Sequence, residues 1–171
     1  MEKQRRIRND ANTTFNVIDV SGNSTKSEMV IQSETPLTPG CLVVPYVGQP
    51  AEVQGWDGSL GAVAAPTGTT TLPLRVVDLG GISGMSLISK FNQGDQVPVL
   101  SGGGATGVHW NVRIAGNETV TVGQRLTYTT DGTGYATAVG ATAANTIGLA
   151  REDLSVADPD LPTFIRMEVL Q

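Results

Sequence analysis

Alternation of apolar and polar residues is the clearest pattern in the chain, and it is strongest between residues 108 and 114. Apolar side chains take one parity and polar ones the other: Val108, Trp110, Val112 and Ile114 against His109, Asn111 and Arg113. A repeat of two residues is typical of a β-strand with one buried face. The pattern recurs at 165–169 and, interrupted by Gly123, at 120–128. These segments predict strands, with Trp110 in the core.

Glycine and proline mark the ends of these runs. The chain has 21 glycines, 9 prolines and only 39% hydrophobic residues, a composition that favours short strands joined by turns. Asp-Gly occurs at 57–58 and at 131–132, each time between β-like runs, where glycine supplies the positive φ of a tight turn. We therefore interpret Gly58, Gly132 and Gly134 as structural turn residues. A β-branched residue at Gly132 is expected to cost about 1 kcal/mol or more.

Three pairs of segments suggest an internal duplication. PLTPGCLV (36–43) aligns with TVTVGQRL (119–126), DGSLGAVAA (57–65) with DGTGYATAV (131–139), and LRVVDL (74–79) with LAREDL (149–154). The order of the segments is kept, while the first loop is longer in the first copy. Two such units predict an all-β fold, a small β-barrel or β-sandwich with pseudo-duplicated halves. Chance similarity in a chain rich in Gly, Val and Thr is the alternative.

Residues 1–35 are polar and predict an extended N-terminal arm, followed by a β core over 36–171. A polar segment buries too little apolar surface to order itself, so its short apolar patches are candidate anchors on a neighbouring molecule. The predicted contact residues of the arm are Phe15, Val17, Ile18, Met29 and Ile31, with Arg5, Arg6 and Arg8 as charge partners.

Charge and hydropathy limit the classes of partner that the chain can bind. The net charge is −5, and residues 1–10 carry +2, so the remainder carries −7. An acidic body argues against nucleic acid as a partner. The chain contains no run of about 18 apolar residues, so it predicts no membrane span. The basic residues near the N-terminus are not followed by the apolar run of a secretory signal. The single cysteine, Cys41, fits a protein made in a reducing cytoplasm and is expected to be buried.

The motifs that could carry chemistry are weak. GGGATG (102–107) matches the dinucleotide pattern, but a strand follows it instead of the required helix. His109 is the only histidine and lies on the polar face of its strand, and Asp131 lacks the spacing of a calcium loop. We expect no catalytic residues, cofactor or metal. Trp56, in a loop, is a possible interface aromatic, although packing over the turn is the simpler interpretation.

The order of these elements carries a resemblance over about four fifths of the chain. The segments are PGCLV, DGSLGAVAAP with LRVVDL, GGISGMSLISKFNQGDQVPVL before VHWNVRIAG, and VTVGQRLTYTTDGTGYATAV with TIGLAREDL and FIRMEVLQ. In this order they resemble the capsid decoration (cement) proteins of tailed bacteriophages. Each motif is only a turn-and-strand signature, so the resemblance lies in their succession.

The resemblance implies a non-enzymatic virion protein, made in the bacterial cytoplasm and bound to the outer surface of the capsid. Its expected partners are copies of itself, in a homotrimer, and the phage major capsid protein. One alternative is a carbohydrate-binding or adhesion module that uses Trp56 and the loop at 102–107. Another is a trimeric β enzyme resembling the dUTP-hydrolysing family, whose serine and tyrosine motifs the chain lacks.

Overall fold

The computed structural model describes residues 18–21, 24–48, 58–68, 73–79, 85–102, 107–139, 145–155 and 163–170. The regular elements within these ranges are all β-strands, and the predicted all-β class is confirmed. They are β1 (Asp19–Ser21), β2 (Thr25–Ile31), β3 (Leu42–Pro45), β4 (Ala62–Ala64), β5 (Arg75–Val77), β6 (Gln96–Ser101), β7 (His109–Arg113), β8 (Thr119–Val120), β9 (Arg125–Tyr128), β10 (Ala136–Ala138), β11 (Gly148–Ala150), β12 (Leu154–Ser155) and β13 (Phe164–Val169).

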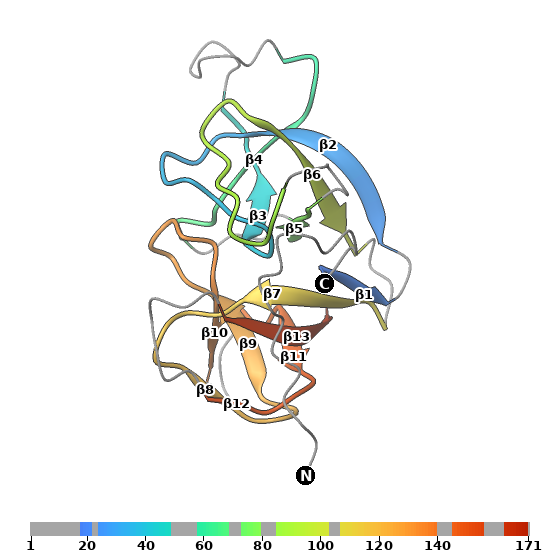
Figure 1. The fold of residues 1–171 in the computed structure, drawn as a ribbon, viewed down its shortest axis with the longest axis vertical. Coiled ribbons are helices and arrows are strands. Elements are labelled where there is room, and N and C mark those ends of the chain that lie inside the picture. The colour runs from blue at the N-terminus through green and yellow to red at the C-terminus, as the bar shows by residue number, and fades with distance from the viewer. Residues whose placement is uncertain are drawn as a thin grey trace.

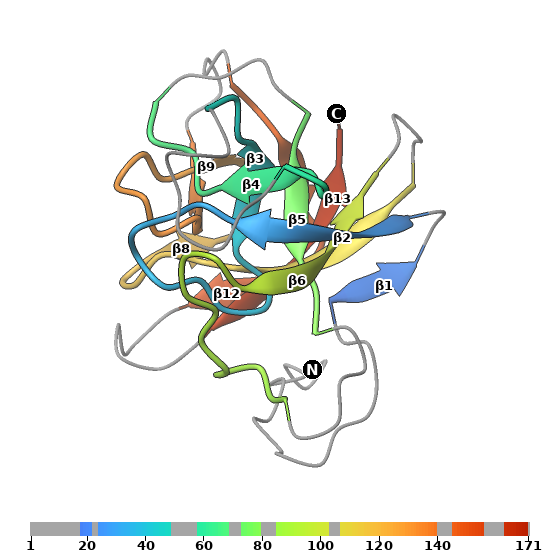
Figure 2. The same cartoon turned by 90° about the horizontal axis from the view of Figure 1, so that it is seen from above.

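The first unit is a closed five-stranded barrel in the order β2-β4-β3-β5-β6, and β6 pairs back to β2. Figure 1 shows it as the upper half of the molecule, and Figure 2 looks onto it from above. The β2–β4 pair is parallel, with Ile31 opposite Val63, and the other pairs are antiparallel. Closure leaves these strands without a free edge, so β2 is an integral wall of the barrel.

The second unit is a six-stranded sheet in the order β1-β7-β13-β11-β9-β10, in the lower half of Figure 1. A parallel bridge between Ile114 and Ala136 brings the β10 edge back to the end of β7. The main-chain nitrogen of Ala115 also donates to the Ala136 carbonyl at 2.8 Å. A separate two-stranded ribbon is formed by β8 and β12. The second sheet therefore curls almost into a barrel.

The two units repeat one strand connectivity. Barrel strands β2, β3, β4, β5 and β6 correspond to β7, β9, β10, β11 and β13 in pairing partners and direction. The bridge of Ile114 to Ala136 corresponds to the pair of Ile31 and Val63. The segment alignment matches Val63 to Thr137 instead, one position further along. The duplication expected from the sequence is thus present in the topology, with a small shift at β10.

Main-chain hydrogen bonds show which residues of the two units are equivalent near the start of β3 and of β9. Gly40 donates to the carbonyl of Val77, and Gly123 donates to that of Ala150, both at 2.8 Å. The segment alignment correctly matches Gly40 to Gly123, but it matches Val77 to Glu152, two positions beyond Ala150. The expected alignment is therefore wrong in register at β10 and β11. The shift of one position at β10 turns each side chain to the other face of the strand, whereas the shift of two positions at β11 keeps the face.

Strand β3 of the first unit is buried on both faces. Val43 points into the barrel core, whose members are Met29, Ile31, Leu37, Cys41, Val43, Val63, Ala65, Val77, Phe91, Val97 and Val99. Its neighbours Leu42 and Val44 belong instead to a second core shared with the curled sheet. This explains the uninterrupted apolar run of β3, since a strand covered on both sides does not alternate.

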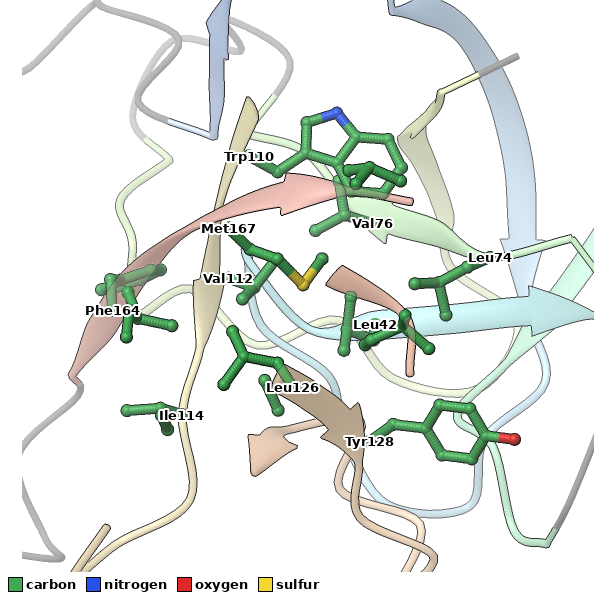
Figure 3. Packing of buried hydrophobic residues seen from close by; sticks show 14 of the residues in the cluster. Leu42, Leu74, Val76, Trp110, Val112, Ile114, Leu126, Tyr128, Phe164 and Met167 are labelled. Atoms are coloured by element: carbon green, nitrogen blue, oxygen red, sulfur yellow. The ribbon is translucent and has the colours of Figure 1, made fainter. Parts of the chain in front are cut away.

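The shared core fills the concave face of the second sheet. Leu42 and Val76 from the barrel and Trp110 and Met167 from the sheet are all buried in it (Figure 3). Trp110 is fully buried, which confirms its expected core position. The indole nitrogen of Trp110 donates to Ser24 Oγ at 3.0 Å. The first barrel thus covers the concave face of the second sheet. In a second closed barrel, that face would be filled by the sheet's own side chains.

A buried cation also joins the units. Arg113 lies on the polar face of β7, yet it is only 6% exposed. Its Nε donates to the Pro39 carbonyl at 3.2 Å, its Nη2 donates to the Leu87 carbonyl, and its guanidinium lies 5.0 Å from the centre of the Phe164 ring. Burial lowers the pKa of Arg113. The hydrogen bonds and the ring take the place of solvent around the charge.

The Cys41 thiol lies in the barrel core, as expected. It is 1% exposed, and burial raises its pKa despite its contact with the Thr38 hydroxyl at 3.5 Å. A protonated, inaccessible thiol is unreactive, so Cys41 acts as a small apolar side chain.

Candidate binding site

Three of the predicted arm anchors lie in the chain's own core. Ile18 and Ile31 are fully buried, and Met29 is 8% exposed. Asp19, next to Ile18, pairs with Trp110 of β7, while Met29 and Ile31 are in the barrel wall. Their assignment as anchors on a neighbouring molecule is wrong. Local polarity misled the prediction, because strands distant in sequence supply the apolar surface that covers them.

The division of the chain at residue 35 is also wrong for residues 24–35. Strand β2 pairs with β6 over six positions, from Thr25 opposite Ser101 to Val30 opposite Gln96. The other predicted contact residues, Arg5, Arg6, Arg8, Phe15, Val17 and Trp56, lie outside the described residues.

The predicted turn glycines adopt left-handed backbone conformations, with φ of 83° at Gly58, 82° at Gly132 and 71° at Gly134. Asp131 stabilises its own turn. Its Oδ1 accepts hydrogen bonds from the Thr133 hydroxyl at 2.6 Å and from the Thr133 main-chain nitrogen at 3.0 Å. The interpretation of these glycines as structural turn residues is thus consistent with their local geometry.

The same turn lines a hollow of about 590 Å³ on the outside of the barrel. The other walls are the segments that follow β2, β3 and β4. The lining residues are Gln32, Ser33, Glu34, Thr35, Val44, Pro45, Tyr46, Val47, Ala64, Ala65, Pro66, Thr67, Gly68, Asp131 and Gly132. Pockets that bind small ligands have volumes in this range. We take this hollow as the candidate binding site.

Hydrogen bonds to the main chain hold the walls in place. Ser33 Oγ accepts a bond of 2.7 Å from the Ala65 nitrogen, which ties the end of β2 to the end of β4. The Tyr128 hydroxyl donates to the Gly68 carbonyl at 3.2 Å, which ties the rim to the second unit. The site is therefore built by both units.

The polar groups of the hollow are acidic or neutral. Glu34 and Asp131 are exposed carboxylates, and the described lining contains no Lys, Arg or His. The hydrogen bond from the Thr133 side chain is the main cause that lowers the pKa of Asp131, and the bond from the Thr133 main chain adds to it. The Asp131 carboxylate is thus ionised at neutral pH, and the hollow disfavours anions.

Two further features of the lining are a buried amide and a half-buried ring. The Gln32 side-chain amide is buried, and neither its Nε2 nor its Oε1 has a hydrogen-bond partner among the described residues. Such a group is costly unless something satisfies it. Tyr46 contributes a half-buried aromatic ring, and Val47, 80% exposed, provides apolar surface beside it. The arrangement offers hydrogen bonding and stacking, and its described lining contains no nucleophile paired with a base.

Sequence reasoning missed this hollow, apart from the Asp131 turn. Its walls come from the segments after β2, β3 and β4 and from the Asp131 turn, which are far apart in the sequence, so no local spacing signals the site. Among the described residues, no group of three or more His, Cys, Asp or Glu side chains is placed to hold a metal ion. The described part of the chain also has no helix long and apolar enough to cross a membrane.

No protein-family model matches the chain, and no curated protein matches it. Among solved structures, the chain is similar to the N base of head fiber gp8.5 of bacteriophage phi29. The sequences are 13% identical, the match covers 86% of this chain and 94% of that chain, and the TM-score is 0.49. This similarity assigns no function.

Proposed function

We propose that the chain is a structural virion protein that binds the outer surface of a phage capsid as an oligomer and stabilises contacts between major capsid subunits. The observation that carries the proposal is the succession of turn-and-strand segments over 36–171, which resembles that of capsid decoration proteins. The doubled β topology accommodates that succession in one body, held by a shared core.

The physical basis of the activity is linkage. A protein that binds the assembled shell, and not the free subunits, stabilises the shell by mass action, about 2.7 kcal/mol per site at a free concentration of 100 Kd. Many symmetric copies multiply this effect. A rigid β body suits the task, since it loses little conformational entropy on binding.

The candidate contact residues differ from the first set. The residues that remain candidates, because the described structure does not include them, are Arg5, Arg6, Arg8, Phe15, Val17 and Trp56. Isolated exposed side chains join them: Val47, Ile88, Val122 and Leu170, each more than half exposed. Exposed apolar side chains are common on any protein, so each requires its own test.

The test uses the purified protein with empty heads of the phage that encodes it. We expect a trimer by native mass measurement, co-sedimentation with the heads, and a higher melting temperature of the decorated heads. A monomeric protein that stays in the unbound fraction at saturating concentration would refute the proposal.

A truncated chain separates the role of the arm from that of the body. A protein starting at residue 16 lacks Arg5, Arg6, Arg8 and Phe15 but keeps every described strand. If the arm contacts the capsid, this protein binds heads more weakly while remaining folded. Equal binding would assign the contact to residues 16–171.

A further inference from the structure

The hollow beside the barrel offers a second, separate activity. Its polar lining combines an amide, two carboxylates and the hydroxyls of Ser33, Thr35 and Thr67, with the Tyr46 ring and apolar surface alongside. A ligand that matches this lining carries many hydroxyl groups and one apolar face. We propose that the hollow binds a neutral oligosaccharide of a few sugar units.

The hydrogen-bonding groups fit hydroxyls in particular. The carboxylate oxygens of Asp131 and Glu34 accept hydrogen bonds, and a sugar hydroxyl donates them. The hydroxyls of Ser33, Thr35 and Thr67 can each donate and accept, so they match sugar hydroxyls in either role. The Tyr46 ring supplies a surface for the C–H face of the sugar.

The charge of the hollow selects against other small ligands. With Glu34 and Asp131 in the lining and no basic side chain among the described lining residues, a phosphate or a sialylated sugar meets repulsion and no counter-charge. A neutral sugar avoids this penalty. The proposal therefore excludes the acidic glycans that a basic groove would prefer.

The fold argues against an extended peptide that adds a strand. The wall strand β4 is already paired on both sides, parallel to β2 and antiparallel to β3. No edge of β4 is left for main-chain pairing by a partner. A proline-rich peptide, which docks on aromatic rings without strand pairing, is tested as a separate outcome.

The experiment measures binding to the full chain by ligand-detected nuclear magnetic resonance and calorimetry. The probes are neutral glucose, galactose and N-acetylglucosamine oligomers, a sialylated oligosaccharide and a proline-rich peptide. We expect at least one neutral oligosaccharide to bind with a Kd of about 1 mM or tighter. Tyr46→Ala and Asp131→Asn should each weaken that binding by about tenfold.

Glu28→Gln is the matched control, because Glu28 is an exposed carboxylate on β2 outside the hollow lining. It should leave affinity unchanged. The proposal is overturned if no neutral oligosaccharide binds, if only the sialylated sugar or the peptide binds, or if Tyr46→Ala and Asp131→Asn bind as tightly as the control. Capsid binding is measured separately on heads without added glycan, so failure of one activity leaves the other standing.

Discussion

The main-chain nitrogen of Leu42 donates a hydrogen bond of 2.6 Å to the carbonyl oxygen of Gly134, so a turn of the second unit is fixed to a strand of the first. A Cβ atom on Gly134 would lie 2.5 Å from the Leu42 carbonyl oxygen, and φ there is 71°. Backbone strain and collision with main-chain atoms act together at this position. We expect Gly134→Ala to lower the free energy of unfolding by about 2–3 kcal/mol.

Gly132, in the same turn, provides the control. Its φ is 82°, but a Cβ there meets nothing within 4 Å. Gly132→Ala should therefore cost only about 1 kcal/mol, from backbone strain alone. Urea denaturation of both variants measures the difference. Equal losses would show that the contact with Leu42 has no energetic role.

Arg113 should be a major source of stability between the units. Arg113→Met removes the donors that satisfy the carbonyls of Pro39 and Leu87, and it leaves the Phe164 ring without its cation. We expect a loss of about 2–4 kcal/mol in the free energy of unfolding. Arg125→Met, at an exposed position on β9, should change it by about 0.5 kcal/mol or less. A similar effect of the two substitutions in urea denaturation would contradict this role.

The Asp131 turn should respond to acid. Because the pKa of Asp131 is lowered by Thr133 in the folded protein, the turn's contribution to stability is fully present above the ordinary aspartate pKa. It is lost as the pH falls through the lowered folded pKa. Thr133→Val removes the hydroxyl donor and should move the pKa of Asp131 back up. Carboxyl chemical shifts followed against pH test this, and an unchanged midpoint in the variant would refute the stated cause.

Truncations distinguish the arm from the barrel. A chain starting at residue 16 keeps Ile18 and β2, so its melting temperature should stay close to that of the full protein. A chain starting at Pro36 lacks Ile18, Met29 and Ile31 and opens the barrel between β4 and β6. We expect it not to fold cooperatively, as measured by circular dichroism on heating. A cooperative transition in that chain would mean that β2 is dispensable.

Gly48 offers a way to move Tyr46 without removing it. A Cβ on Gly48 would collide with the Tyr46 hydroxyl oxygen and with atoms of its ring. These atoms are at the far end of the half-buried Tyr46 side chain, so the ring has to move to make room for the Cβ. Gly48→Ala should therefore weaken oligosaccharide binding several-fold and leave the melting temperature nearly unchanged. Unaltered affinity would indicate that the present ring position is not the one that binds.

Local pattern predicted the strands that alternate. The segments around Trp110 and Met167 form β7 and β13, and Trp110 is buried as expected. Their periodicity is visible because one face of each strand is apolar and the other polar. Strand β2 escaped prediction because its first half, at Thr25–Glu28, is largely exposed and its apolar half is short. Its partners lie far along the chain, where no local pattern records them.

The two units also differ in which of their equivalent residues are buried, and a sequence repeat does not show this difference. Leu42 and its counterpart Arg125 hold equivalent positions in β3 and β9. Leu42 is buried in the shared core, whereas Arg125 is exposed. The duplicated pattern predicts two similar barrels. In the structure, the outer face of the first barrel instead covers the open face of the second sheet. The hollow arises from this asymmetric packing and was therefore out of reach of sequence comparison between the halves.

Strand β1 pairs with β7, and β2 pairs with β6. In each pair, the second strand is synthesised long after the first. While the first strands emerge, their partners do not yet exist, and the first barrel can close only after Ser101 has been added. Until then Met29 and Ile31 are open to solvent and to other nascent chains. The earliest strands therefore wait longest for their partners, and slow synthesis through the middle of the message should lower the yield of folded product.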